Sequence, residues 1–196
     1  MLLSDRSIRD ELERGGIAIE PLDDDAVQPS SVDLRLDSTF RVFHNHSVPL
    51  LDVRTDQTGI TETIELPAGQ RLALQPGELI LGSTLERVSI SERLVGRLEG
   101  KSSLGRLGLL IHSTAGFIDP GWTGHLTLNL YNAAKLPILL YPGMKVCQVS
   151  FLEMTTAADV PYGTARARSK YQGQQGPGPS RSYEDFAEPG GRDARS

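Results

Sequence analysis

Apolar and polar residues alternate over several short stretches of the chain, with the period of two that is typical of strands buried on one face. The alternation is clearest at residues 32–37, 126–131 and 147–151. Pro-Gly dipeptides, which are strong turn signals, recur at 76–77, 120–121 and 142–143. Many short strands separated by turns of this kind predict a mostly β protein, built as an antiparallel sandwich or barrel.

One short helix is predicted ahead of the strands. Ser4 is placed to act as its N-cap, and Ile8 and Leu12 share one face. The glycine pair at 15–16 ends the pattern. We therefore expect a short amphipathic helix at the N-terminus, followed by strands.

The C-terminal part of the chain differs in composition from the rest. From Tyr162 onward it is rich in Gly, Pro, Ser, Arg and Gln and poor in apolar residues. Such a composition cannot bury enough surface to offset the entropy of ordering, so we expect residues 187–196 to be a disordered tail. Residues 162–186 include Tyr162, Lys170 and Gln174, side chains that can become ordered on a ligand or a neighbouring subunit. We therefore predict one domain over residues 1–186, with 162–186 as its C-terminal lid.

Composition and charge narrow the class of protein. The 196 residues carry a formal net charge of −5, which argues against a nucleic-acid partner. No apolar run approaches the ~20 residues of a membrane span, and the N-terminus lacks the features of a signal peptide. Cys147 is the single cysteine, which excludes an internal disulfide and a multi-cysteine zinc site. We expect a soluble, cytoplasmic protein with no membrane partner.

Residues 100–106, Gly-Lys-Ser-Ser-Leu-Gly-Arg, have the composition of a site for a polyanion. Small residues let the backbone approach phosphate oxygens, Ser102 and Ser103 can donate hydrogen bonds, and Lys101 and Arg106 supply positive charge. The spacing of a Walker A loop is absent. On these grounds alone an ordinary polar turn is as good an interpretation as a phosphate site.

Together with His112–Trp122, this segment resembles the signature of dCTP deaminases, members of the trimeric dUTPase-like superfamily. Blocks at 28–35, 136–148 and 169–177 resemble other motifs of the same family, so the resemblance covers about residues 1–186. It implies a distorted jelly-roll-like β-barrel, a homotrimer, and active sites shared between subunits.

Gly116 and Phe117 make the sequence similar to the bifunctional, dUMP-forming branch of that family. Enzymes of this branch deaminate dCTP and then cleave the triphosphate with release of pyrophosphate, which supplies the deoxyuridine nucleotide for thymidylate synthesis. The other branch carries a bulkier polar pair at these two positions.

The resemblance also implies a mechanism without a metal in the protein. A carboxylate would shuttle the proton, while Ser102, Arg106 and the carbonyl of Ala115 orient the water and the base. The family places a glutamate where this sequence has Asn129. Asparagine cannot accept and return a proton, and a general acid–base group contributes about 10²–10⁴-fold in rate. If the family mechanism holds, deamination by this chain should be severely impaired.

The resemblance carries a set of nucleotide-binding positions onto this sequence. They are Lys101, Ser102, Ser103, Leu104, Gly105, Arg106, Asp119, Thr127, Leu128, Asn129, Gln148, Tyr162, Lys170 and Gln174. Mg²⁺ would enter bound to the triphosphate, with no ligands from protein side chains and no zinc. The expected ligands are deoxynucleotides of the dCTP, dUTP and dTTP type.

Strand periodicity independently places Thr127 and Asn129 on one face, opposite three leucines. Such a face can point to a ligand or simply to solvent.

Asn129 leaves several explanations open. It can be a natural departure from the family, an introduced substitution that traps the nucleotide, or a change compensated by another carboxylate, for which Asp119 is the nearest candidate. Two other functions therefore compete with deamination. One is a dUTPase-like pyrophosphatase, and the other is a catalytically silent trimeric module that only binds nucleotides.

Overall fold

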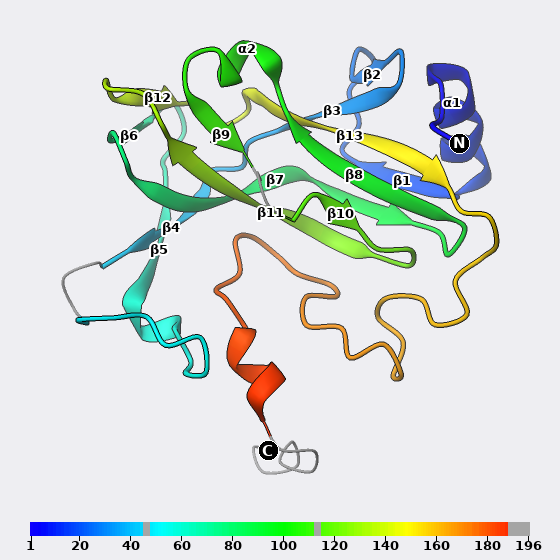
Figure 1. Cartoon of the computed structure of the whole chain (residues 1–196). Helices are drawn as coiled ribbons and strands as arrows, with labels where there is room; N and C mark the ends of the chain where they lie inside the picture. Colours follow the sequence, from blue (N-terminus) through cyan, green and yellow to red (C-terminus); the bar gives the residue numbers. More distant parts are fainter. Residues whose placement is uncertain (45–47, 112–114, 188–196) are drawn as a thin grey trace.

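A computed structural model describes residues 1–44, 48–111 and 115–187. The chain is mostly β-structure with a short helix at its N-terminus (Figure 1), as predicted. In chain order the elements are α1 (Asp5–Arg14), β1 (Ile17–Glu20), β2 (Val27–Gln28), β3 (Ser31–Arg35), β4 (Thr39–Phe43), η1 (Thr58–Ile60), β5 (Thr61–Glu65), β6 (Leu72–Leu74), β7 (Leu79–Ile90), β8 (Leu94–Gly100), α2 (Ser102–Gly105), β9 (Leu109–Ile111), β10 (Phe117–Ile118), β11 (Thr123–Asn132), β12 (Ile138–Leu140), β13 (Lys145–Glu153) and η2 (Ser182–Phe186).

Two antiparallel sheets enclose the core. One has the order β5-β4-β7-β11-β9, with β1 also paired to β7, and the other has the order β10-β8-β13-β3-β2. A small two-stranded antiparallel sheet of β6 and β12 lies beside them. Alternate residues of β11 and β13 are buried, and their side chains form one continuous cluster with those of the other strands. The three alternating stretches of the sequence overlap β3, β11 and β13. Of the two predicted architectures, sandwich and barrel, the sandwich fits this arrangement of two sheets.

The N-terminal helix follows its sequence signals. The hydroxyl of Ser4 accepts a hydrogen bond from the backbone N–H of Ser7, and Ile8 is fully buried. Gly15 ends the helix with a φ of 76°, a conformation that favours glycine.

The C-terminal segment lies along the first sheet. After β13 the chain crosses in irregular conformation on the side away from α2 and ends in η2 (Figure 1). Its backbone extends the pairing of β11, since Gly173 N–H donates to Thr123 O at 2.8 Å and His125 N–H donates to Gln174 O at 2.9 Å. Residues 173 and 174 are therefore held against β11. Of the predicted tail over residues 187–196, residues 188–196 lie outside the described residues.

No helix in the described part of the chain is long and apolar enough to cross a membrane.

Candidate active site

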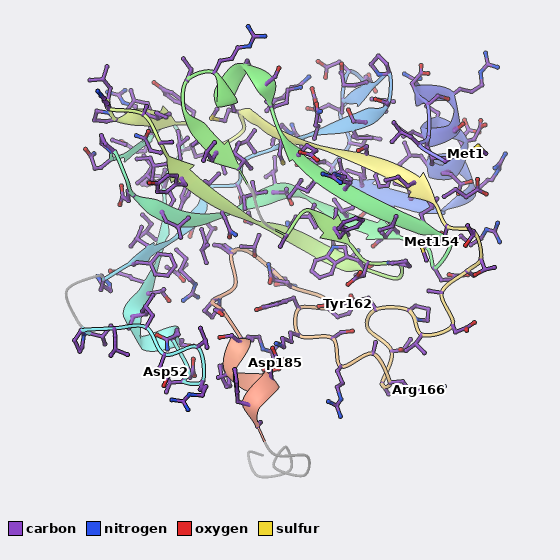
Figure 2. All side chains as sticks on the ribbon, viewed as in Figure 1. Met1, Asp52, Met154, Tyr162, Arg166 and Asp185 are labelled. Atoms are coloured by element: carbon purple, nitrogen blue, oxygen red, sulfur yellow. The ribbon has the colours of Figure 1, made fainter. Side chains whose placement is uncertain are left out.

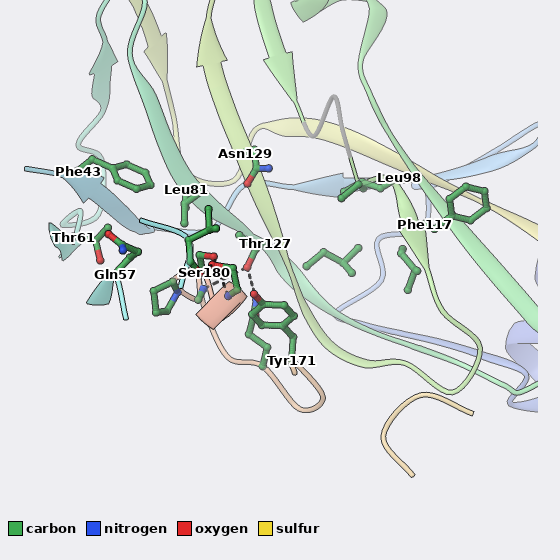
Figure 3. Close-up of a pocket in the computed structure, with 18 of the residues that line it drawn as sticks. Phe43, Gln57, Thr61, Leu81, Leu98, Phe117, Thr127, Asn129, Tyr171 and Ser180 are labelled. Carbon is green, nitrogen blue, oxygen red and sulfur yellow. Dashed lines mark hydrogen bonds between the residues drawn. The ribbon is translucent and has the colours of Figure 1, made fainter. Parts of the chain in front are cut away.

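A cavity of about 550 Å³ lies between β11 and the C-terminal segment. Thr127 and Asn129 line it from β11, as Figure 3 shows, between Leu81 on one side and Leu98 on the other. Of the predicted site residues, the cavity brings together Ala115, Phe117, Asp119, Thr127, Asn129, Tyr162 and Gln174. These residues come from four separate parts of the sequence, so their meeting supports the site inferred from the motifs.

The orientation of Thr127 and Asn129 depends on an irregularity in the pairing of β7 with β11. The register passes from His125 opposite Arg87 to Thr127 opposite Ser83, so β7 holds extra residues there. The buried hydroxyl of Thr84 accepts a hydrogen bond from Leu126 N–H at 3.0 Å, which replaces the lost ladder bond. Beyond the bulge, Asn129 and Thr127 share the cavity face.

The C-terminal segment closes the cavity. The side-chain amide of Gln174 donates to the hydroxyl of Thr127 and to Gly176 O at 3.1 Å. Tyr162 accepts a hydrogen bond from Tyr171 N–H at 3.0 Å, and its ring lies 5.5 Å from that of Trp122. Both Tyr162 and Gln174 thus line the cavity.

Two glycines permit close approaches at the site. At Gly121, whose φ is 88°, a Cβ would lie 2.8 Å from Pro161 Cβ and 2.9 Å from Tyr162 O. At Gly116, a Cβ would lie 2.9 Å from Leu98 O, and Gly116 O accepts a hydrogen bond from Leu98 N–H at 2.7 Å. A larger residue at 116 would push β10 away from β8.

The remaining predicted residues do not line this cavity in the described chain. Ser102, Ser103, Gly105 and Arg106 are exposed on and beside α2, and Gln148 is half-buried on β13. Leu128 is fully buried, so its side chain faces the core, and only its backbone can meet a ligand. Within one chain the predicted nucleotide residues therefore form two groups. The cavity set is the one named above, and the α2 set consists of Ser102, Ser103, Gly105, Arg106 and Gln148.

Two lysines of the predicted phosphate site are engaged by carboxylates. Lys101 Nζ lies 2.6 Å from Oδ1 of the buried Asp33, and Lys170 Nζ lies 2.6 Å from Oδ2 of Asp185 on η2. Neither ammonium group stands free beside the cavity.

Residues 2–154 match the family model described as dCTP deaminase-like. The chain belongs to the dCTP deaminase-like family.

Curated relatives of the chain agree with this family over nearly its whole length. It is 57% identical over 186 residues to "dCTP deaminase, dUMP-forming" of Mycobacterium sp. (strain KMS), covering 95% of this chain and 98% of that protein. The protein of the same name from Salinispora arenicola (strain CNS-205) is 55% identical, with 95% and 97% covered. The resemblance inferred from the motifs, including the dUMP-forming branch, is confirmed.

Among solved structures, the chain is similar to the crystal structure of 2'-deoxycytidine 5'-triphosphate deaminase from Agrobacterium tumefaciens. The TM-score is 0.59 and the sequence identity 25%, and the match covers 76% of this chain. It spans 46% of that longer chain.

The sequence analysis did not predict one wall of the cavity. The loop before β5 contributes Leu51, Asp52, Val53 and Gln57. Figure 2 shows Asp52 and Asp185 on the same side of the sheets, and the Ser182 hydroxyl donates to Val53 O at 2.8 Å. The sequence signal for this wall was a few apolar residues, such as Leu51 and Val53, in an otherwise polar stretch. Such a signal does not indicate what these residues contact.

Asp52 is a second carboxylate at the cavity besides Asp119. The guanidinium of Arg54, which donates to it at 3.0 Å, holds the pKa of Asp52 below its ordinary value. This carboxylate is thus ionised at neutral pH and is a poor candidate for a proton donor.

Proposed function

We propose that this protein is a dCTP deaminase of the dUMP-forming type, and that Asn129 impairs its deamination step. Identities of 55–58% to proteins named for that activity, over 95% of the chain, support the proposal. The single observation that carries it is the position of Asn129, half-buried on β11 beside Thr127 in the cavity. The substrate would be a free nucleotide, so we expect the protein to act in the cytoplasm.

The reaction consumes two water molecules. One replaces the amino group at C4 of cytosine and releases ammonia, and the other cleaves the bond between the α- and β-phosphates and releases pyrophosphate. In the first step a carboxylate at position 129 would take a proton from the water and return it to the leaving amine. The amide of Asn129 can hydrogen-bond the base or the water but cannot move a proton.

The other β11 residues that line the cavity, Leu126 and Thr127, carry no ionisable side chain to take over that role. The hydroxyl of Thr127 already accepts hydrogen bonds from Gln174 and from Gly178 N–H, the latter at 3.3 Å. Asp119, in the turn before β11, remains as the alternative carboxylate. We assign it to the sugar or to the water of phosphate cleavage.

The set around α2 would complete the site in a neighbouring subunit. Ser102 and Arg106 project from α2 into solvent in one chain, and Gln148 stands on the outer face of its sheet. Large apolar side chains are exposed around them: Leu107, Leu110, Leu136, Leu139 and Tyr141. A homotrimer that buries these side chains would bring Ser102, Arg106 and Gln148 of one subunit to the cavity of the next.

The divalent cation would arrive with the nucleotide. Within the described ranges there is no group of three or more His, Cys, Asp or Glu side chains that could hold a metal. We propose that phosphate oxygens and water hold the Mg²⁺ ion, which would neutralise part of the triphosphate charge. Lys170 and the α2 set would bind the remaining charge.

Product analysis tests the proposal. The Asn129→Glu variant is incubated with dCTP and Mg²⁺, and separately with dUTP, and dCTP, dUTP and dUMP are resolved by chromatography. We expect dUMP from dCTP. Cleavage of dUTP without any deamination would instead indicate a pyrophosphatase, and tight binding without turnover of either nucleotide would indicate a silent binding module.

A further inference from the structure

The two residues of β10 face opposite sides of their sheet. Ile118 is buried above Gly96, where a Cβ would lie 3.0 Å from the Ile118 Cδ1 atom. Phe117 is paired with Arg97 of β8, so the two side chains stand next to each other on the outer face. Phe117 is 67% exposed although it lines the cavity, which places its ring at the rim.

Arg97 holds this exposed ring by its face. The guanidinium carbon of Arg97 lies 5.8 Å from the centroid of the Phe117 ring, within the range of a cation–π interaction. Arg97 Nε also donates to Oε1 of Glu99 at 2.6 Å, from the same face of β8. The carboxylate thus orients the guanidinium, and the guanidinium lies over the ring.

The same face carries residues of the α2 set. On β13, Ser150 lies opposite Arg97 and Gln148 lies opposite Glu99. Arg97 therefore stands between Phe117 of the cavity set and the row that contains Gln148. Arg97 contacts Phe117 of the cavity set, and its partner Glu99 lies opposite Gln148 of the α2 set.

We propose that Arg97, held by Glu99, is a positioning residue for the triphosphate-cleavage step. It orients Phe117 at the rim of the cavity, so that the deaminated nucleotide is retained until pyrophosphate has left. This rests on the proposed function, because it concerns how dUTP is partitioned between cleavage and release. An exposed aromatic ring without such a partner would sample several rotamers and leave the rim open part of the time.

The fraction of product released as dUTP tests the proposal in the Asn129→Glu background. Arg97→Met keeps the length of the side chain but removes its charge, and we expect it to raise the dUTP fraction about two- to fivefold, the range of an exposed cation–π contact. The rate of dCTP consumption should change by less than twofold. Arg93→Met is the matched control, since Arg93 is an exposed arginine just before β8 whose nearest carboxylate, Glu153, is 3.8 Å away.

A double-mutant cycle separates positioning of the ring from a general effect of charge. Phe117→Leu should also raise the dUTP fraction, and Arg97→Met should add nothing in that background. Glu99→Gln should act in the same direction as Arg97→Met. An unchanged dUTP fraction in Arg97→Met, an equal rise in Arg93→Met, or additive effects in the cycle would overturn the proposal.

Failure of the proposed function is distinguishable from failure of this inference. If the Asn129→Glu chain turns over neither dCTP nor dUTP, the proposed function is wrong, and the same cycle is measured as dUTP binding to the unmodified chain by calorimetry. Arg97→Met and Phe117→Leu should each weaken binding about two- to fivefold, and the double variant no further. No weakening, or fully additive weakening, would refute the role of Arg97.

Discussion

The side-chain amide of Gln174 donates a hydrogen bond to the hydroxyl of Thr127, two residues before Asn129 on the same face of β11. Both residues line the cavity, so the C-terminal segment is attached to the wall of the site itself. Removing this attachment should loosen the lid without unfolding the sheets, because the buried core lies on the other faces of the strands.

Replacing Gln174 by alanine is therefore expected to weaken binding of dCTP. One hydrogen bond contributes about 1 kcal/mol, which corresponds to roughly a fivefold rise in Kd by calorimetry. Gln172→Ala is the matched control, since the Gln172 amide donates to Gly121 O at 3.0 Å outside the cavity lining. An equal effect of both variants would mean that the segment acts only by covering the site.

Asp185 on η2 forms an ion pair with Lys170, so it would compete with the nucleotide for this ammonium group if Lys170 binds the triphosphate as we propose. Asp185→Asn should therefore tighten binding of dCTP with Mg²⁺, and only about two- to fivefold, because the Asp185 side chain is 66% exposed and such pairs are weak. Asp159→Asn, which removes the same charge from another exposed position, should leave the affinity unchanged. Weaker binding by Asp185→Asn would show that the ion pair supports the closed lid instead.

Mixed oligomers test whether two chains build one site. The unmodified chain has Arg106 but lacks a carboxylate at position 129, and the double variant Asn129→Glu/Arg106→Ala has the reverse. Each chain should be inactive alone, whereas a mixture of the two, refolded together, should deaminate dCTP. In some sites of the mixture, the carboxylate introduced at position 129 of one chain would be combined with Arg106 of another. If Asn129→Glu is active and the mixture is not, both groups act within one chain.

Cys147 is expected to be unreactive in the folded protein. It is fully buried on β13, and desolvation raises the pKa of its thiol far above the ordinary value, so the reactive thiolate does not form. Because the shift is upward, stability is unaffected below the unfolded pKa of about 8.5 and falls only in more alkaline solution. A thiol reagent at neutral pH should label the chain after denaturation only, and rapid labelling of the native protein would contradict this.

Local patterns were sufficient to predict the fold class and some of its elements. Alternation placed β11 and β13, and Ser4 with Gly15 bounded α1. The face shared by Thr127 and Asn129 also followed from periodicity, because side-chain direction in a strand is a local property.

Contacts between distant segments could not be predicted in the same way. The pairs Lys101 with Asp33 and Lys170 with Asp185 depend on how strands and segments meet, and no local pattern indicates either pair. The loop that supplies Leu51 to the cavity was missed for the same reason. The separation of the motif residues into two sets follows from topology, since α2 and the cavity lie on different parts of one chain.

Turnover of dCTP by three chains tests the central claim most directly: the unmodified chain, Asn129→Glu and Asn129→Gln. Glutamine has the length of glutamate without an ionisable group, so it separates reach from proton transfer. We predict that the Asn129→Glu chain deaminates dCTP at least about 10²-fold faster than either of the other two chains. Equal rates in the unmodified chain and the Asn129→Glu variant, or an Asn129→Gln variant as fast as Asn129→Glu, would contradict the assignment of proton transfer to position 129.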